Sequence, residues 1–183
     1  IGKAIAKLFA KQGAEVNILD FDENGAAQTA SEITTDGGKG FAIKCDVSNQ
    51  QQVKEIVKSI TATSGTIDIL VNNAGVAHIG TVETTGEDDF NRLLNVNVKG
   101  VYNCMQASIP FMKEKGGSIL NMASIASSVG IPDRFAYSMT KGAVKAMTLS
   151  AARDYMQDKI RVNCISPARV HTPFVDGFIA KNY

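Results

Sequence analysis

The chain has 183 residues, of which 44% are hydrophobic, and a formal net charge of +1 at pH 7. This length is enough for one domain with a substantial core, so residues 1–183 are treated as a single domain. The near-zero charge gives no electrostatic basis for binding nucleic acid or an anionic membrane, and no apolar stretch is long enough to span a bilayer.

Apolar runs alternate with helical patterns along the chain. This alternation predicts an α/β fold in which a doubly wound parallel sheet is covered by helices on both faces. The expected strands are residues 15–20, 40–45, 67–72, 119–122 and 160–165. The expected helices are residues 24–34, 49–63, 87–113 and 136–158. Ser48 is the expected N-cap of the second of these helices.

A potential proton-transfer pair lies in the last predicted helix. Tyr137 and Lys141 are four residues apart, which places both side chains on one face of the helix. A lysine ammonium near a phenol favours the phenolate, which can take a proton from an alcohol. Ser124 follows a predicted buried strand, so its hydroxyl is expected at the carboxyl edge of the sheet, where such folds bind ligands. Taken alone, a tyrosine and a lysine at this spacing usually form a solvated helix face.

Three further segments change that interpretation. They are the strand that runs into Asn73-Ala74-Gly75, the segment Asn95-Val96-Asn97, and Cys45-Asp46-Val47. Together with Ser124 and the tyrosine–lysine pair, they closely resemble the classical short-chain dehydrogenase/reductase family, from Ile1 to about Thr172. The resemblance implies a Rossmann-like fold and an enzyme whose catalytic residues are Asn97, Ser124, Tyr137 and Lys141.

The same resemblance implies a nicotinamide dinucleotide site. Gly2 matches the last glycine of the family's phosphate loop, at a helix N-terminus. Asp20, at the end of its strand, would bind the adenosine ribose hydroxyls and repel a 2′-phosphate, which predicts NAD as the cofactor; the alternative is an aspartate that opens a turn. Ala168 departs from the glycine that is usual in the family. The expected cofactor-binding residues are Ile1, Gly2, Asp20, Asp46, Val47, Asn73, Ala74, Gly75, Tyr137, Lys141, Val170 and Thr172.

The expected substrate-binding residues are Ser124, Tyr137 and Arg134. Arg134 lies where type 2 hydroxybutyrate dehydrogenases, which the chain also resembles, use an arginine on the substrate acid. A small hydroxy acid or sugar-derived acid is therefore the expected small-molecule substrate, and no metal is expected. Alternatives are a surface arginine paired with Asp133, a sugar or polyol substrate, and a 3-oxoacyl reductase. Two other classes of function stay open: a catalytically silent dinucleotide-binding protein, and an isomerase or dehydratase.

Assembly, location and completeness are also expectations. Family members pair through two long helices, here residues 87–113 and 136–158, so a homotetramer is expected. Cys45, Cys104 and Cys164 are widely spaced in apolar surroundings and are expected to be buried thiols of a cytoplasmic protein. The resemblance further predicts that the sequence lacks the family's first strand and C-terminal end, which would leave neighbouring strands unpaired.

Overall fold

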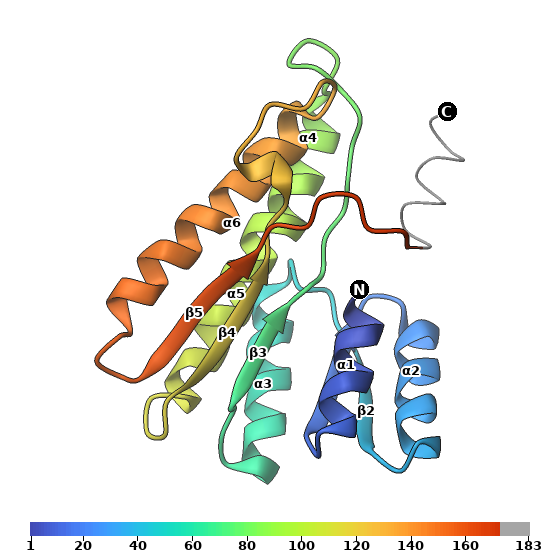
Figure 1. Ribbon diagram of the computed structural model, residues 1–183, viewed down its shortest axis with the longest axis vertical. Coiled ribbons are helices and arrows are strands. Elements are labelled where there is room, and N and C mark those ends of the chain that lie inside the picture. The colour runs from blue at the N-terminus through green and yellow to red at the C-terminus, as the bar shows by residue number, and fades with distance from the viewer. Residues whose placement is uncertain (173–183) are drawn as a thin grey trace.

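The computed structural model describes residues 1–172, which form parallel strands alternating with helices (Figure 1). The strands are β1 (Glu15–Asp20), β2 (Lys39–Lys44), β3 (Ile69–Asn72), β4 (Gly117–Met122) and β5 (Ile160–Ile165). The helices are α1 (Gly2–Lys11), α2 (Glu23–Thr35), α3 (Gln50–Ser64), α4 (Glu87–Leu93), α5 (Gly100–Ser108) and α6 (Phe135–Asp154). The α/β fold with parallel strands is therefore confirmed.

The strands form two hydrogen-bonded groups. One has the order β1-β2, and the other has the order β3-β4-β5. Within residues 1–172 no ladder joins the two groups, so β1 and β3 each keep one edge without a strand partner. Because all pairs are parallel, the carboxyl ends of the strands lie at a common edge, and the segments that follow them can meet there.

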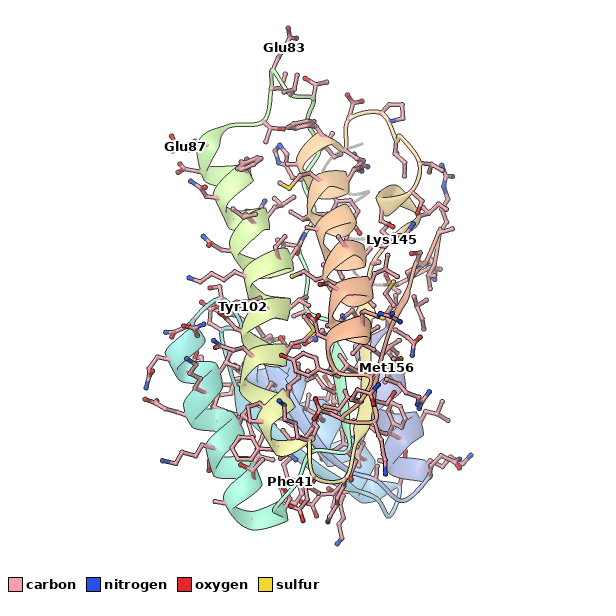
Figure 2. All side chains as sticks on the ribbon, turned by 90° about the vertical axis from the view of Figure 1, so that its left-hand side faces the viewer. Phe41, Glu83, Glu87, Tyr102, Lys145 and Met156 are labelled. Carbon is pink, nitrogen blue, oxygen red and sulfur yellow. The ribbon has the colours of Figure 1, made fainter. Side chains whose placement is uncertain are left out.

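Helices pack on both sides of the strands, α1 and α2 against β1 and β2, and α5 and α6 against β3, β4 and β5. Figure 1 shows α1 and α2 packed beside β1 and β2, while α3, α5 and α6 lie on the opposite face. In Figure 2, which looks onto that second face, the α4–α5 segment and α6 run side by side. Among residues 1–172, no helix is both long and apolar enough to cross a bilayer.

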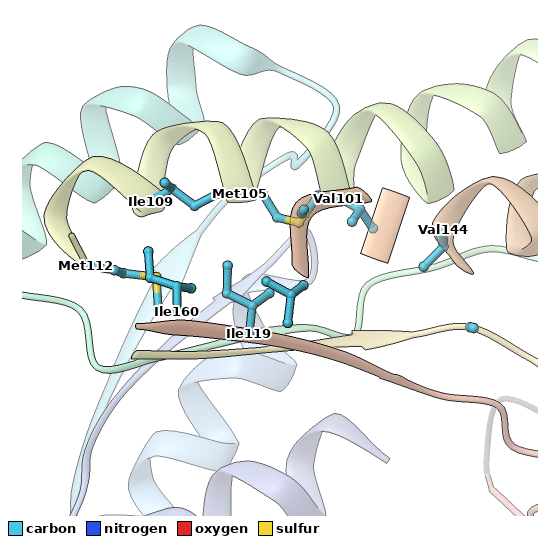
Figure 3. Close-up of a cluster of buried hydrophobic side chains, with 10 residues drawn as sticks. Val101, Met105, Ile109, Met112, Ile119, Val144 and Ile160 are labelled. Atoms are coloured by element: carbon cyan, nitrogen blue, oxygen red, sulfur yellow. The ribbon is translucent and has the colours of Figure 1, made fainter. Parts of the chain in front are cut away.

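The largest hydrophobic core lies between β4, β5, α5 and α6 (Figure 3). Ile119 and Val144 are fully buried there, and Ile160 is 2% exposed. Burying each such side chain contributes about 1.5–3 kcal/mol. A second core joins Cys45 at the end of β2 to Val53 of α3 and Cys104 of α5. These cores fix the helices of the second face against the strand ends.

The cysteines are free thiols. Cys45 and Cys104 are buried and Cys164 is half-buried. Burial raises the pKa of the Cys104 thiol to about 12, so this side chain behaves as a small hydrophobic group at neutral pH.

Three predicted helix details are wrong. The predicted helix 87–113 is interrupted by a π-helical turn, η1 (Leu94–Lys99), and ends in the 3₁₀ turn η2 (Ile109–Phe111). Helix α6 ends at Asp154 and not at residue 158. The N-cap of α3 is Asn49, whose side chain accepts from Gln52 N at 3.1 Å. Ser48 lies one residue before this cap, and its amide and its hydroxyl both donate to the Asp46 carboxylate.

Candidate active site

One cleft of about 830 Å³ opens at the carboxyl ends of the strands. Residues predicted from the sequence for cofactor or substrate binding line it from seven segments of the chain. They are Ile1, Asp20, Asp46, Val47, Asn73, Ala74, Gly75, Ser124, Tyr137, Lys141, Val170 and Thr172. A cleft of this size that combines apolar walls with convergent polar groups is typical of a small-molecule site.

Tyr137 and Lys141 lie on the face of α6 that is turned toward the cleft. The Lys141 Nζ atom lies 5.8 Å from the centroid of the Tyr137 ring. This Nζ also donates to the backbone carbonyl of Met122, at the end of β4, at 2.7 Å. Lys141 is 6% exposed, and burial lowers the pKa of its ammonium from 10.5 to about 8. The lysine thus stays charged at neutral pH beside the phenol ring.

Ser124 follows β4 and is 8% exposed at the cleft wall. Its side-chain oxygen accepts a hydrogen bond from Ala126 N at 3.2 Å, and Ser124 is the N-cap of the 3₁₀ turn η3 (Ile125–Ser127). Because that bond uses a lone pair of the oxygen, the hydroxyl proton can be donated elsewhere. The serine is thus oriented as a donor at the edge of the cleft.

Asn97 lies in the π-helical turn and is fully buried. Its Oδ1 accepts from Val76 N at 2.8 Å, and its Nδ2 donates to Val76 O at 2.9 Å. Nδ2 also donates to Thr140 Oγ1 at 3.0 Å, on the same helix as Tyr137. Asn97 therefore does not line the cleft itself, but it joins the chain after β3 to α6.

Two glycines allow close approach around the cleft. A Cβ on Gly2 would lie 2.6 Å from Asn73 Nδ2, so the start of α1 approaches the end of this side chain closely. A Cβ on Gly75 would lie 3.3 Å from Asn97 Oδ1 and 3.4 Å from Lys141 Nζ. A side chain at position 75 would therefore crowd both the Asn97 amide and the Lys141 ammonium.

The end of the cleft nearest β1 is acidic. Asp20 closes β1 and its Oδ1 accepts from Asp22 N at 3.0 Å. Lys44 is paired with Asp20 in the sheet register, yet its Nζ lies 3.5 Å from a Glu23 carboxylate oxygen. The nearby lysine is thus engaged by another carboxylate and leaves the charge of Asp20 in place.

The structure does not bring Arg134 into this cleft. Its guanidinium donates to the backbone carbonyl of its neighbour Asp133 at 2.9 Å. A short bridge pairs Arg134 with Gly80, which places it beside the segment that follows β3. Its role in binding substrate therefore stays a prediction. Within residues 1–172, no group of three or more His, Cys, Asp and Glu side chains is arranged to hold a metal ion.

Sequence reasoning missed several polar residues that shape the site. Arg92 and Asn95, on α4 and η1, line the cleft. Thr140 accepts from Asn97 and donates to the Tyr137 carbonyl at 2.8 Å. Asn103 of α5 donates to the carbonyl of Val47 at 2.8 Å. The two asparagines Asn97 and Asn103 lie six residues apart on one helical segment, but only the first belongs to a recognised motif.

Comparisons with known proteins agree on one family. The family model described as "Enoyl-(Acyl carrier protein) reductase" matches residues 1–182. An uncharacterised oxidoreductase of Bacillus subtilis, YxbG, is 39% identical over 177 residues, which are 96% of this chain and 65% of that protein. The chain thus spans slightly less than two thirds of the length of that relative.

Solved structures give the same result. A crystal structure described as a candidate short-chain dehydrogenase/reductase of Burkholderia xenovorans has a TM-score of 0.95 and 31% identity, over 99% of this chain and 70% of that one. A gluconate 5-dehydrogenase of Burkholderia cenocepacia, in complex with NADP and tartrate, has a TM-score of 0.91 and 31% identity, over 97% of this chain and 70% of that one.

Proposed function

The chain belongs to the short-chain dehydrogenase/reductase family, and from this premise we propose that it interconverts a secondary alcohol and a ketone with NAD(H). The observation that carries the proposal is the shared cleft of Ser124, Tyr137 and Lys141, three residues from two different parts of the chain. When bound there, the nicotinamide ring would supply or accept the hydride.

Tyr137 is the proposed general acid/base. Its phenol oxygen would take the hydroxyl proton of the alcohol during oxidation and return a proton to the carbonyl oxygen during reduction. The Lys141 ammonium, 5.8 Å from the ring centroid, stabilises the phenolate by its charge. The bond from Lys141 to Met122 O keeps the ammonium in place while the tyrosine exchanges its proton.

Ser124 is the proposed donor to the substrate oxygen. Since Ala126 N occupies a lone pair of its hydroxyl, the proton is available for the oxygen on which charge develops. Asn97 is proposed to support the site by holding Val76 and Thr140; the catalytic role that the family resemblance implies for it stays a prediction.

NAD is the proposed cofactor in preference to NADP. The support is the carboxylate of Asp20 at the cleft, which would repel a 2′-phosphate, with Lys44 engaged by Glu23. Against it stands the gluconate 5-dehydrogenase, which is 31% identical and was crystallised with NADP. The ratio of kcat/KM for the two cofactors decides the question, and a higher value with NADP contradicts the assignment.

A small hydroxy acid or sugar-derived acid is the proposed substrate. The similarity to a gluconate 5-dehydrogenase solved with tartrate supports this class. A sugar or polyol and a 3-oxoacyl thioester are the alternatives. A panel of these compounds, followed by NADH absorbance, tests the whole proposal: net reduction of NAD identifies the dehydrogenase and its substrate class. A silent binding protein or an isomerase would give no net NADH with any of them.

A homotetramer is the proposed assembly. Exposed apolar side chains lie on α5, on α6 and in the turn that follows α6: Tyr102, Leu149 and Met156 are 44%, 65% and 53% exposed. Tyr102 and Met156 are labelled in Figure 2. Covering them with a second subunit would remove apolar surface from water. A monomeric mass of the protein in light scattering would contradict the proposal.

A further inference from the structure

The cleft segment after β2 is fixed from behind by one side chain of α5. Asn103 is fully buried, and its Nδ2 donates to two successive carbonyls, Val47 O at 2.8 Å and Ser48 O at 3.2 Å. Val47 and Ser48 both line the cleft. Both bonds join residues more than 50 positions apart, so they tie a helix of one layer to the wall of the site.

A second contact from the same helix acts on the same segment. Gly100 lies one turn before Asn103, on the same side of α5. A Cβ on Gly100 would lie 2.7 Å from Val47 Cγ2 and 3.3 Å from Val47 Cβ. Val47 is thus held at its carbonyl by Asn103 and at its side chain by the uncovered backbone at Gly100.

Packing alone does not explain an asparagine at position 103. Among residues 1–172, its Oδ1 has no hydrogen-bond partner although the side chain is fully buried. A leucine of similar size would fill the space and bury no amide oxygen, but it could not donate to the carbonyls of Val47 and Ser48. The amide NH2 group is bonded and, among the same residues, the amide oxygen is not. We take this to indicate that asparagine is needed at this position for its two hydrogen bonds to the carbonyls of Val47 and Ser48.

The segment that Asn103 holds belongs to the Asp20 end of the cleft. Cys45 N donates to Asp20 O at 2.8 Å, so the two strand ends are joined directly. The Asp46 carboxylate accepts from Ser48 N at 2.9 Å and closes a tight turn over the same residues. This turn is the part of the wall that Asn103 positions, and it does not include Ser124 or Tyr137.

We propose that Asn103 is a positioning residue for the adenine half of the cofactor: it fixes the carbonyls of Val47 and Ser48 so that the 46–48 turn keeps the shape that receives the base. The inference rests on the proposed function, because it requires a dinucleotide in this cleft. Asn103 itself does not touch the ligand and acts only through the turn.

The test compares Asn103→Leu and Gly100→Ala with the wild-type protein, using ADP-ribose as a probe that lacks the nicotinamide ring. Both variants should raise the Kd for ADP-ribose in calorimetry by about fivefold to tenfold, since each displaces the same turn. With saturating NAD, kcat should stay within about twofold of the wild type, since the proton-transfer residues are held by other contacts.

Thr61→Val is the matched control. Thr61 is a buried polar residue of α3 that bonds within its own helix, to Val57 O at 2.9 Å, so its loss perturbs stability without touching the turn. The Kd for ADP-ribose should not change in this control. Circular dichroism and thermal unfolding confirm that each variant is folded; if Asn103→Leu does not fold, Gly100→Ala carries the test.

The outcomes separate the two proposals. A folded variant with unchanged Kd for ADP-ribose overturns the role of Asn103, as does an equal rise in the Thr61→Val control. A loss of kcat at unchanged Kd also overturns it, because that result places the effect at the proton-transfer end. If the wild-type protein itself binds no ADP-ribose, the proposed function fails and this inference fails with it.

Discussion

The ammonium of Lys141 lies 2.7 Å from the carbonyl oxygen of Met122, and this bond joins α6 to the end of β4. Ser124 follows Met122 by two residues, and Tyr137 lies one helical turn before Lys141. A single lysine therefore links the two segments that carry the proposed donor and the proposed acid/base. Its role is mechanical as well as electrostatic.

Tyr137→Phe is expected to reduce kcat by about 10²–10⁴-fold, because only the transferable proton is removed. The dissociation constant for NAD, measured by quenching of intrinsic fluorescence or by calorimetry, should stay nearly unchanged. Tyr155→Phe, at the far end of α6, is the control and should behave as the wild type. Wild-type turnover by Tyr137→Phe with the best substrate would refute the assignment.

Lys141→Met should raise the free energy of unfolding while it abolishes activity. Burial lowers the pKa of Lys141 to about 8, so the folded protein binds this proton less tightly than the unfolded chain does. The resulting penalty is fully present below about pH 8 and disappears as the pH rises toward 10.5. Burial of the Lys141 charge destabilises the wild type by about 3 kcal/mol. Because Lys141→Met also loses the hydrogen bond to Met122 O, about 1 kcal/mol of this gain in stability is lost again.

Urea denaturation of the wild type and of Lys141→Met, from neutral pH to about pH 10.5, tests whether the substitution stabilises the fold. The stability advantage of Lys141→Met should be largest near neutral pH and should shrink as the pH rises above about 8. A constant difference at all pH values would show that burial of the charge is not its source.

Asp20→Ser combined with Phe21→Arg should shift the cofactor preference toward NADP. The first change removes the carboxylate that would repel a 2′-phosphate, and the second adds a partner for it at a residue that is 73% exposed. The ratio of kcat/KM for NADP over NAD measures the shift. Asp20→Asn, which removes only the charge, should fall between the two proteins; a ratio that does not move in either variant contradicts the role of Asp20.

Arg134→Leu tests the acid-binding hypothesis. If the guanidinium binds a substrate carboxylate, KM for the best acid should rise by the equivalent of about 2–4 kcal/mol, with NAD binding unaffected. Arg153→Leu, near the other end of α6, is the control. Equal kcat/KM for the wild type and Arg134→Leu would rule out a role of Arg134 in binding the substrate acid.

Leu149→Glu should dissociate the proposed tetramer into smaller species, because it places a charge on an exposed apolar position of α6. Light scattering with size-exclusion chromatography gives the mass. Leu8→Glu is the matched control: Leu8 is 61% exposed on α1, on the other face of the protein, and its replacement should leave the mass unchanged. A tetramer that survives Leu149→Glu places the interface elsewhere.

The order and type of every strand followed from the sequence, because buried parallel strands are short apolar runs between helical patterns. Most residues around the cleft also followed, since their motifs lie directly after those strands. The π-helical turn at Asn97 could not be predicted, because residues 94–99 continue the helical pattern and contain no proline or glycine that would mark a change. Thr140 and Asn103 were missed for another reason: each acts through a contact with a residue remote in sequence, and such contacts leave no periodic signal.

Six residues separate Asn97, which holds the chain after β3, from Asn103, which holds the chain after β2. In this helical segment each added residue would turn the following side chains by about 100°. A one-residue insertion or deletion between the two asparagines would therefore point one of them away from its loop unless the helix changed its winding. The exposed tip at residues 81–84 has no such constraint. We therefore expect insertions and deletions of one residue to be tolerated at that tip. The same changes at residues 98–102 should abolish dinucleotide binding.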